Sequence, residues 1–212
     1  MSGNIVENRV VILSACPVSP QMRSLLRPDD YIIACDAGYR NAEPLGCRPR
    51  LILGDFDSAP CPEFPDIVVL PHIKDDTDTQ YAAQWAVLHG AREVLMLGAL
   101  GGIRMEHTLA NLCTGLYLAK NGVAVEIADE HSSVRYFSPE KKLVIERENW
   151  DYFSVFPMEG ILEGLSIQGA FYPLENAELK SDYPLGVSNE FTEPEVTVLC
   201  RSGWGIVVCT KE

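Results

Sequence analysis

The sequence predicts an α/β protein, with an N-terminal domain on an open, mostly parallel α/β/α sheet followed by a small C-terminal antiparallel β-sandwich domain. In the first part, short apolar runs alternate with helical stretches, which favours parallel strands covered on both faces. After about Ser132 the helical periodicity fades, and short strand-like runs are separated by Gly, Pro and Asn. We therefore place two domains at residues 1–131 and 132–212.

The first part contains six runs that are short, apolar and typical of strands. They cover residues 9–14, 31–36, 51–55, 67–70, 93–98 and 123–129. One helix begins at Thr77, which forms a capping box with Gln80, and ends at Gly90. A second helix covers about residues 107–120 and ends at Asn121-Gly122.

The second part contains five strand-like runs. They are KLVIE, YFSVFP, LSIQGAF, VTVLC and GIVVC. The last two flank Arg201-Ser202-Gly203, which we expect to be a hairpin turn.

The composition restricts the classes of ligand and the compartment. With 17 Lys plus Arg against 30 Asp plus Glu, the net charge of −13 argues against nucleic acid or anionic lipid as a partner. A bound polyanion would need local neutralisation, for which a divalent cation held by carboxylates is the obvious candidate. The N-terminus has no basic region, and no stretch approaches the roughly 20 apolar residues that span a bilayer. We therefore expect a cytoplasmic protein. The seven cysteines include no CxxC pair, which indicates reduced thiols without a zinc site.

Acidic residues follow three neighbouring predicted strands at the point where each strand ends. They are Asp36, then Asp55 and Asp57, then Asp75, Asp76 and Asp78. In an open α/β sheet, ligands bind beyond the carboxyl ends of the strands. Asp55 and Asp57 are two residues apart, so in an extended chain they point the same way while Phe56 points into the core. Such a group of carboxylates suits Mg²⁺. The alternative is that each Asp caps a helix or forms a turn.

A glycine-rich segment lies between a predicted strand and the second predicted helix. Gly101 and Gly102 would let the backbone approach a phosphate, although the pattern is neither GxGxxG nor a P-loop. Arg104 is a bidentate donor that suits phosphate oxygens, with a surface ion pair as the alternative. We interpret His107 as a helix-start or packing residue, because no second histidine stands at metal-ligand spacing from it.

Several motifs, in this order, resemble the thiamine pyrophosphokinase (thiamine diphosphokinase) family. They are GDFDS, K-x-x-TD, a Gly-Gly-x-Arg-x-acid-His-x-x-x-Asn segment, GLSIQGAFYPLENAEL, GVSNEF and a final GxxVV run. The resemblance extends from about Val10 to Val208. It implies an α/β domain that binds ATP and Mg²⁺, a β-sandwich domain that binds thiamine, and a homodimer with active sites between subunits. It also implies the activity, in which ATP and thiamine give AMP and thiamine diphosphate.

The resemblance also implies roles for individual residues. Asp55, Asp57 and Asp78 match the Mg²⁺-binding acids, and Asp36 matches the acid of a nucleotide-side Asp-Gly-Gly turn. The positions expected around ATP and its phosphates are Lys74, Thr77, Gly101, Gly102, Arg104 and Asn111. The positions expected near thiamine are Ser188 and Asn189, to which we add Trp204 as an aromatic side chain in the same half.

Two residues depart from the family pattern. Glu106 stands where the family usually has Asp, and Ala37 replaces the second residue of Asp-Gly-Gly, where a positive φ would strain it.

In the expected reaction, the thiamine hydroxyl attacks the β-phosphorus of ATP. Lys74 and Arg104 would stabilise the developing charge, and Glu106 or a metal-site Asp would accept the proton. Two other interpretations stay open at this stage. One is a Mg²⁺-dependent phosphohydrolase or a transferase acting on another hydroxylated heterocycle, and the other is a non-catalytic nucleotide- or thiamine-sensing module.

Overall fold

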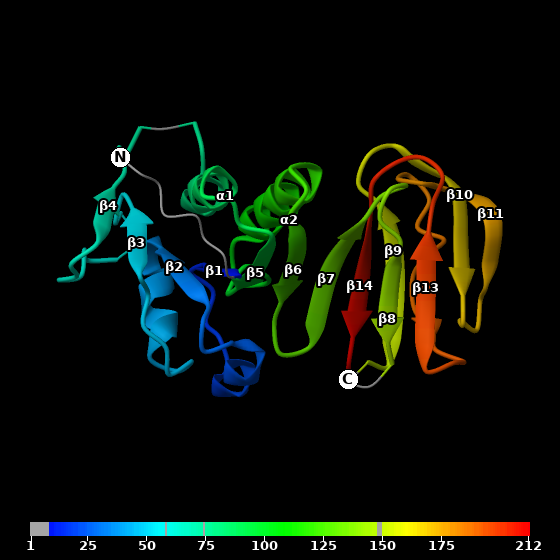
Figure 1. Ribbon diagram of the computed structural model, residues 1–212, viewed down its shortest axis with the longest axis horizontal. Coiled ribbons are helices and arrows are strands. Elements are labelled where there is room, and N and C mark those ends of the chain that lie inside the picture. The colour runs from blue at the N-terminus through cyan, green and yellow to red at the C-terminus, as the bar shows by residue number, and fades with distance from the viewer. Residues whose placement is uncertain (1–8, 58, 74, 148–149) are drawn as a thin grey trace. The chain divides into compact units, whose positions relative to one another are not determined.

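The computed structural model describes residues 9–57, 59–73, 75–147 and 150–212 (Figure 1). The chain divides into two compact units, Met1–Glu130 and His131–Glu212. Among the described residues, no helix combines the length and the apolar character that crossing a membrane requires.

The first unit is built on a parallel sheet with the strand order β6-β5-β1-β2-β3-β4. Its strands are β1 (Val10–Leu13), β2 (Tyr31–Cys35), β3 (Leu51–Gly54), β4 (Ile67–Val69), β5 (Glu93–Leu97) and β6 (Ala124–Ala128). Every neighbouring pair is parallel, as the apolar runs predict. All four residues of β1 and of β3 are buried, because both faces of the sheet are covered.

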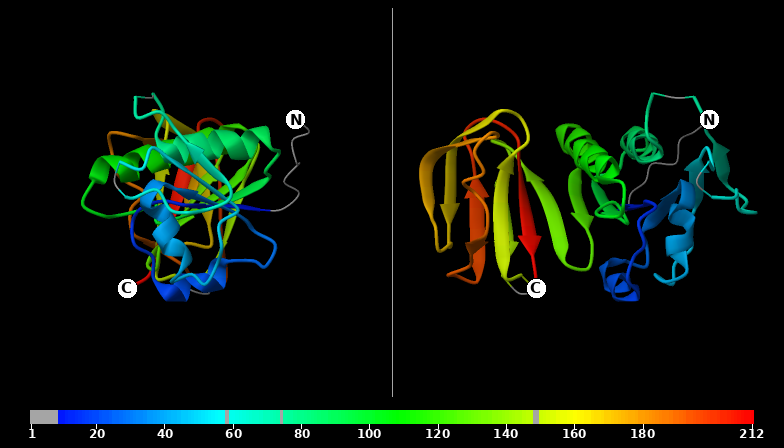
Figure 2. Two further views of the ribbon diagram at one scale, coloured as in Figure 1. Left: turned by 90° about the vertical axis from the view of Figure 1, so that its left-hand side faces the viewer. Right: turned by 180° about the vertical axis from the view of Figure 1, so that it is seen from behind.

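Two α-helices and two 3₁₀-helices cover this sheet. The 3₁₀-helices η1 (Pro20–Leu25) and η2 (Asp36–Ala42) contribute Met22 and Ala42 to a core cluster with alternate residues of β1, β2 and β5. The helices α1 (Asp78–Leu88) and α2 (Met105–Lys120) pack against each other and against strands of the sheet (Figure 2). The α/β/α arrangement is confirmed, with 3₁₀-helices rather than α-helices on one face.

Both predicted α-helices form close to their expected positions. Thr77 is the N-cap of α1, and its Oγ1 accepts from the Gln80 N–H at 3.1 Å. Gln80 Oε1 instead accepts from Thr114 Oγ1 of α2 at 2.9 Å, so the predicted capping box is only half right. This bond ties the first turn of α1 to the middle of α2.

The second unit consists of two antiparallel sheets. One has the order β12-β9-β14-β7 and the other β11-β10-β13-β8. The strands are β7 (Ser132–Phe137), β8 (Leu143–Glu146), β9 (Tyr152–Pro157), β10 (Ile161–Gln168), β11 (Leu174–Lys180), β12 (Asn189–Glu190), β13 (Glu195–Leu199) and β14 (Gly205–Thr210). The expected sandwich is confirmed.

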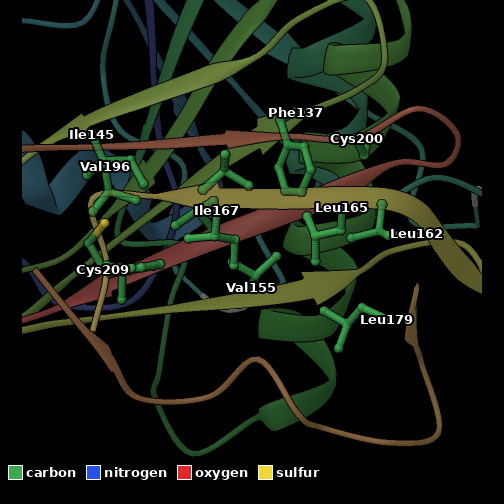
Figure 3. Close-up of a cluster of buried hydrophobic side chains, with 14 of the residues drawn as sticks. Phe137, Ile145, Val155, Leu162, Leu165, Ile167, Leu179, Val196, Cys200 and Cys209 are labelled. Carbon is green, nitrogen blue, oxygen red and sulfur yellow. The ribbon is translucent and has the colours of Figure 1, made fainter. Parts of the chain in front are cut away.

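Side chains from both sheets form the core of this sandwich (Figure 3). Phe137 and Phe153 come from one sheet, and Leu162, Ile167 and Val198 come from the other.

A bulge in β10 keeps its apolar side chains on the core face. At Gly164, which has φ +63°, the pairing with β11 shifts, so that Leu162 and Leu165 are both buried.

The expected hairpin at Arg201-Ser202-Gly203 is wrong. β13 pairs with β10 and β8, whereas β14 pairs with β7 and β9, so this segment crosses from one sheet to the other. Ser202 bridges Glu163 of β10, and Gly203 has φ +96° with its Cβ position 2.5 Å from a backbone oxygen of Ile161. Local turn chemistry is the same for a hairpin and for a crossing, so the sequence pattern could not separate the two.

Candidate active site

Loops that follow the carboxyl ends of the parallel strands of the first unit enclose a cavity of about 380 Å³, which we call the rim cavity. Its walls come from the segments after β1, β2 and β5 and from the first turns of α1 and α2. Seven of the residues expected to bind ATP or metal line it: Asp36, Thr77, Asp78, Gly101, Gly102, Arg104 and Asn111. Asp36 and Asn111, which are 75 positions apart in the sequence, thus line the same cavity, because parallel strands end at the same edge of the sheet.

Asp36 sits at the start of η2 in a constrained backbone conformation. It has φ +46° and is 8% exposed, and its Oδ1 is buried with no hydrogen-bond partner among the described residues. Close packing produces this turn: a Cβ on Gly54 would lie 2.9 Å from Asp36 Cα, and a Cβ on Gly38 would lie 2.1 Å from the Leu13 oxygen. The positive φ therefore falls on Asp36 and not on Ala37, so the alanine introduces no strain there.

Two buried asparagines hold the loops of the rim cavity. Asn111 Nδ2 donates to the Ala99 oxygen at 2.7 Å, which fixes the glycine-rich loop to α2. Asn41 Nδ2 donates to the oxygens of Ser14 (2.7 Å) and Cys16 (2.8 Å), which fixes the loop after β1. Asn41 was not predicted from the sequence, because it lies in no motif and its role depends on a loop 25 residues away.

The glycine-rich loop has the backbone conformation that glycine permits. Gly98, Gly101 and Gly102 have φ of +66°, +75° and +78°. A Cβ on Gly98 would lie 2.6 Å from the oxygens of Ser14 and Cys16, whereas Gly101 has nothing within 4 Å of its Cβ position. Gly98 therefore serves packing, and Gly101 leaves an open surface at the cavity.

Arg104 is the N-cap residue of α2 and pairs with Glu106 in the first turn. Arg104 Nε donates to Glu106 Oε1 at 2.8 Å, and the two side chains are 64% and 65% exposed. The hydrogen bond from Arg104 lowers the pKa of Glu106 below its usual value. His107 lies in the first turn as expected, but it is exposed and lines the rim cavity instead of packing.

Asp55 and Asp57 form an acidic cluster with His72, in which one ligand atom of each residue lies within 4.8 Å of the others. His72 Nδ1 is 3.5 Å from Asp55 Oδ2. The two aspartates share a side, but the reason given by the sequence is wrong: β3 ends at Gly54, and the chain turns at Phe56, which has φ +55°. Phe56 packs against the core as expected.

The third predicted metal ligand lies elsewhere among the described residues. Asp78 opens α1 and lines the rim cavity, and the acidic cluster contains His72 in its place. His72 was not predicted from the sequence, where its one signal is that it follows β4 toward the same edge of the sheet. Lys74 lies outside the described residues.

The residues expected near thiamine all belong to the second unit, where both polar side-chain atoms of Asn189 form hydrogen bonds. Its Oδ1 accepts from the N–H groups of Tyr172 (2.9 Å) and Glu190 (3.0 Å), and its Nδ2 donates to the Tyr172 oxygen at 2.8 Å. Ser188 is exposed, has φ +57°, and donates its N–H to Ser154 Oγ. Trp204 is half-buried.

Two family models match the chain. Residues 22–127 match the thiamin pyrophosphokinase catalytic domain, and residues 140–204 match the thiamin pyrophosphokinase vitamin B1 binding domain. The chain belongs to the thiamine pyrophosphokinase family. Membership of the thiamine pyrophosphokinase family confirms the predicted activity, an ATP-dependent transferase that acts on thiamine.

Individual thiamine pyrophosphokinases agree with this assignment. The enzyme from Bacillus subtilis is 27% identical over 183 residues, which are 83% of this chain and 85% of the relative. A structure from Geobacillus thermodenitrificans has a TM-score of 0.85 at 27% identity and covers 97% of this chain and 98% of its own. The Bacillus subtilis structure has a TM-score of 0.87 at 24% identity, covering 97% of this chain and all of its own, and shows the shared fold.

Proposed function

We propose that this thiamine diphosphokinase binds the phosphates of ATP in the rim cavity and holds Mg²⁺ with Asp55 and Asp57 of the acidic cluster and with Asp78, which lines the adjoining rim cavity. The observation that carries the proposal is that seven separately predicted residues line one cavity. Donors and acceptors suited to a nucleotide are present there: open backbone at Gly101, the guanidinium of Arg104, and the buried carboxylate of Asp36.

The donor set fits Mg²⁺. Carboxylate oxygens are the ligands that Mg²⁺ prefers, and the acidic cluster holds two carboxylates within 4.8 Å. The imidazole nitrogen of His72 is a poorer ligand for this ion, so we assign His72 to orienting Asp55 through the 3.5 Å contact. When bound, Mg²⁺ would neutralise phosphate charge that a chain of net charge −13 otherwise repels.

Asp36 supports a role toward the nucleotide. Its Oδ1 is a buried acceptor without a partner among the described residues, and such a group is costly unless a donor reaches it. We assign it to a hydroxyl or amino donor of the nucleotide, while Thr77 and Asn111 shape the adjoining walls.

The contact between Arg104 and Glu106 supports different catalytic roles for these two residues, which the sequence left open. The lowered pKa of Glu106 makes it a weak proton acceptor, and its hydrogen bond holds the Arg104 side chain. We therefore assign charge stabilisation to Arg104, together with Lys74, and a positioning role to Glu106. The proton of the thiamine hydroxyl passes in this proposal to a carboxylate oxygen of the acidic cluster.

On the thiamine side, we propose that Ser188 and Trp204 contact the substrate and that Asn189 positions the backbone at Tyr172. The bonds of Asn189 support this division, because its amide atoms already serve Tyr172 and Glu190. Phe171 and Tyr172 form an exposed T-shaped aromatic pair with centroids 4.9 Å apart, which suits a cationic aromatic substrate.

We also propose a cytoplasmic homodimer with its active sites at the subunit interface. Large apolar side chains exposed in the second unit support an interface: Phe171, Tyr172, Tyr183, Leu185 and Val187. All seven cysteines are free thiols, as a reducing compartment favours.

One assay tests the proposal directly. The purified protein is incubated with ATP, Mg²⁺ and thiamine, and AMP and thiamine diphosphate are followed together. We expect both products in equal amounts, only with thiamine, and none after chelation of the metal. Release of free phosphate without thiamine would instead support the hydrolase interpretation.

A further inference from the structure

The edge of the first sheet opposite the rim cavity holds a second cavity, of about 430 Å³. Its walls come from η1 and from the segments that enter β2 and β3, so they lie at the amino ends of these strands. Four arginines line it: Arg23, Arg27, Arg48 and Arg50. We call it the arginine cavity, and it shares no lining residue with the rim cavity.

This concentration of positive charge is unusual for the chain. Four of its 17 basic residues gather here, although the net charge is −13. Arg27 donates to Glu93 at 2.7 Å, but Arg23, Arg48 and Arg50 make no ion pair with any residue that the structure describes. Neighbouring guanidinium groups repel one another unless an anion lies between them.

Asp30, the one carboxylate lining this cavity among the described residues, leaves that charge uncompensated. Asp30 is 6% exposed and accepts from Arg9 Nε (2.9 Å), Arg9 Nη2 (2.8 Å) and the Arg27 N–H (2.7 Å). Its charge is therefore matched by Arg9, which does not line the cavity.

The four arginines are exposed, and three of them contact neighbouring rings or backbone. Arg48 lies over the ring of Phe64 at 5.7 Å, and Arg50 lies over Tyr31 at 5.8 Å. The Tyr31 ring in turn stacks on Trp85 with centroids 5.0 Å apart. Arg23 lies against Gly46, where a Cβ would come within 3.0 Å of its guanidinium. Contacts of this kind reduce the entropy that a side chain loses when it binds a ligand.

We propose that the arginine cavity is a metal-independent binding site for a small anion with two phosphate groups. Guanidinium groups bind phosphate oxygens in a bidentate manner, and the volume lies within the usual range for small ligands. The net negative charge of the whole chain disfavours a polymeric anion, which would extend beyond the arginines. A compact diphosphate would lie within the cavity and interact mainly with the positive charge of the arginines there. Binding here is separate from the reaction, because the site lies at the opposite edge of the sheet and needs no carboxylate-bound cation.

Titration calorimetry with sodium pyrophosphate, in EDTA and without Mg²⁺, tests this site on the full chain. We expect saturable 1:1 binding that weakens by about tenfold or more in the double variant Arg48→Gln/Arg50→Gln. The matched control is Arg40→Gln, which removes an exposed arginine that also lies over a tyrosine but does not line the cavity. Absence of binding by the wild-type chain overturns the proposal, as does an equal loss in Arg40→Gln. Loss in Arg104→Gln but not in the double variant would place the anion in the rim cavity and also overturn it.

Cysteine labelling gives a second readout that needs no variant. Cys47 lines the arginine cavity, whereas Cys61 and Cys113 are exposed and do not. Burial raises the pKa of the Cys47 thiol, so alkylation is followed at alkaline pH by mass spectrometry of each site. We expect pyrophosphate to slow alkylation of Cys47 and to leave Cys113 unchanged. Unchanged labelling of Cys47 at saturating pyrophosphate contradicts the proposal, even if Arg48→Gln/Arg50→Gln fails to fold.

Discussion

The rim cavity of the first unit and the Ser188–Asn189 segment of the second unit use polar residues in opposite ways. In the rim cavity, the buried Oδ1 of Asp36 has no hydrogen-bond partner among the described residues. In the second unit, both amide atoms of Asn189 are occupied by backbone groups of its own sandwich. The hydrogen bonds therefore separate two kinds of residue within a binding motif: one with a free polar atom that we expect to contact a ligand, and one whose polar atoms already hold the backbone.

The largest expected effect is the loss of reaction rate when an aspartate of the first unit is replaced. Asp57→Asn removes a charge from the acidic cluster, and we expect a rate loss of about 10²–10³-fold, since stabilisation of phosphate charge depends on it. Asp57 is exposed, so the melting temperature should stay unchanged. Steady-state kinetics and thermal unfolding measure both quantities. The control is Asp66→Asn, an exposed aspartate before β4, which should keep full activity. Turnover near wild-type in Asp57→Asn would remove Asp57 from the metal site.

Two glycines of the first unit separate packing from ligand contact. Gly38→Ala puts a Cβ 2.1 Å from a backbone oxygen, and we expect a destabilisation of about 3 kcal/mol or more. Gly101→Ala meets no atom within 4 Å and strains only a φ of +75°, which costs about 1 kcal/mol. Thermal unfolding should therefore separate them clearly, while the KM for ATP should rise only in Gly101→Ala. Equal melting temperatures for the two variants would contradict the packing at Gly38.

In the second unit, Asn189→Ala tests the positioning role. Loss of its buried amide leaves backbone groups of Tyr172 unpaired, and we expect a loss of about 1–3 kcal/mol in the free energy of unfolding. The KM for thiamine should rise with it, because the backbone at Tyr172 is no longer held. Ser188→Ala is the comparison: it should raise KM with no change in stability, since Ser188 is exposed and its hydrogen bond to Ser154 is made by its backbone N–H. A stable Asn189→Ala protein with impaired thiamine binding would show that the side chain contacts the ligand instead.

The smallest effect is expected for Glu106→Gln. The pKa of Glu106 is lowered, so its carboxylate is already ionised at pH values where an ordinary glutamate takes up a proton. The acidic limb of the pH–rate profile should therefore stay in place in this variant. The rate should fall less than about tenfold, because an exposed ion pair holds Arg104 only weakly. A variant that loses the acidic limb would identify Glu106 as the proton acceptor after all.

Much of the fold could be predicted because its signals are local. Apolar runs of four to seven residues marked every strand of the first unit, and Thr77 and Gly90 marked the limits of α1. Several strands of the second unit escaped notice, among them Leu174–Lys180, which is mostly exposed and carries little apolar pattern. Asp57 was predicted beside Asp55, but His72 was not, because it follows a different strand and comes close to Asp55 only in the folded sheet.

The sequence by itself determined the family, the order of strands and α-helices in the first unit, and the list of polar residues that follow its parallel strands. These depend on spacing along the chain, which fixes which side chains share a strand end. Only the tertiary structure decided that residues 201–203 cross between sheets, that Asp36 rather than Ala37 takes the positive φ, and that four arginines meet at the far edge. Each of these outcomes depends on which distant backbone or ring lies opposite, and no local pattern carries that information.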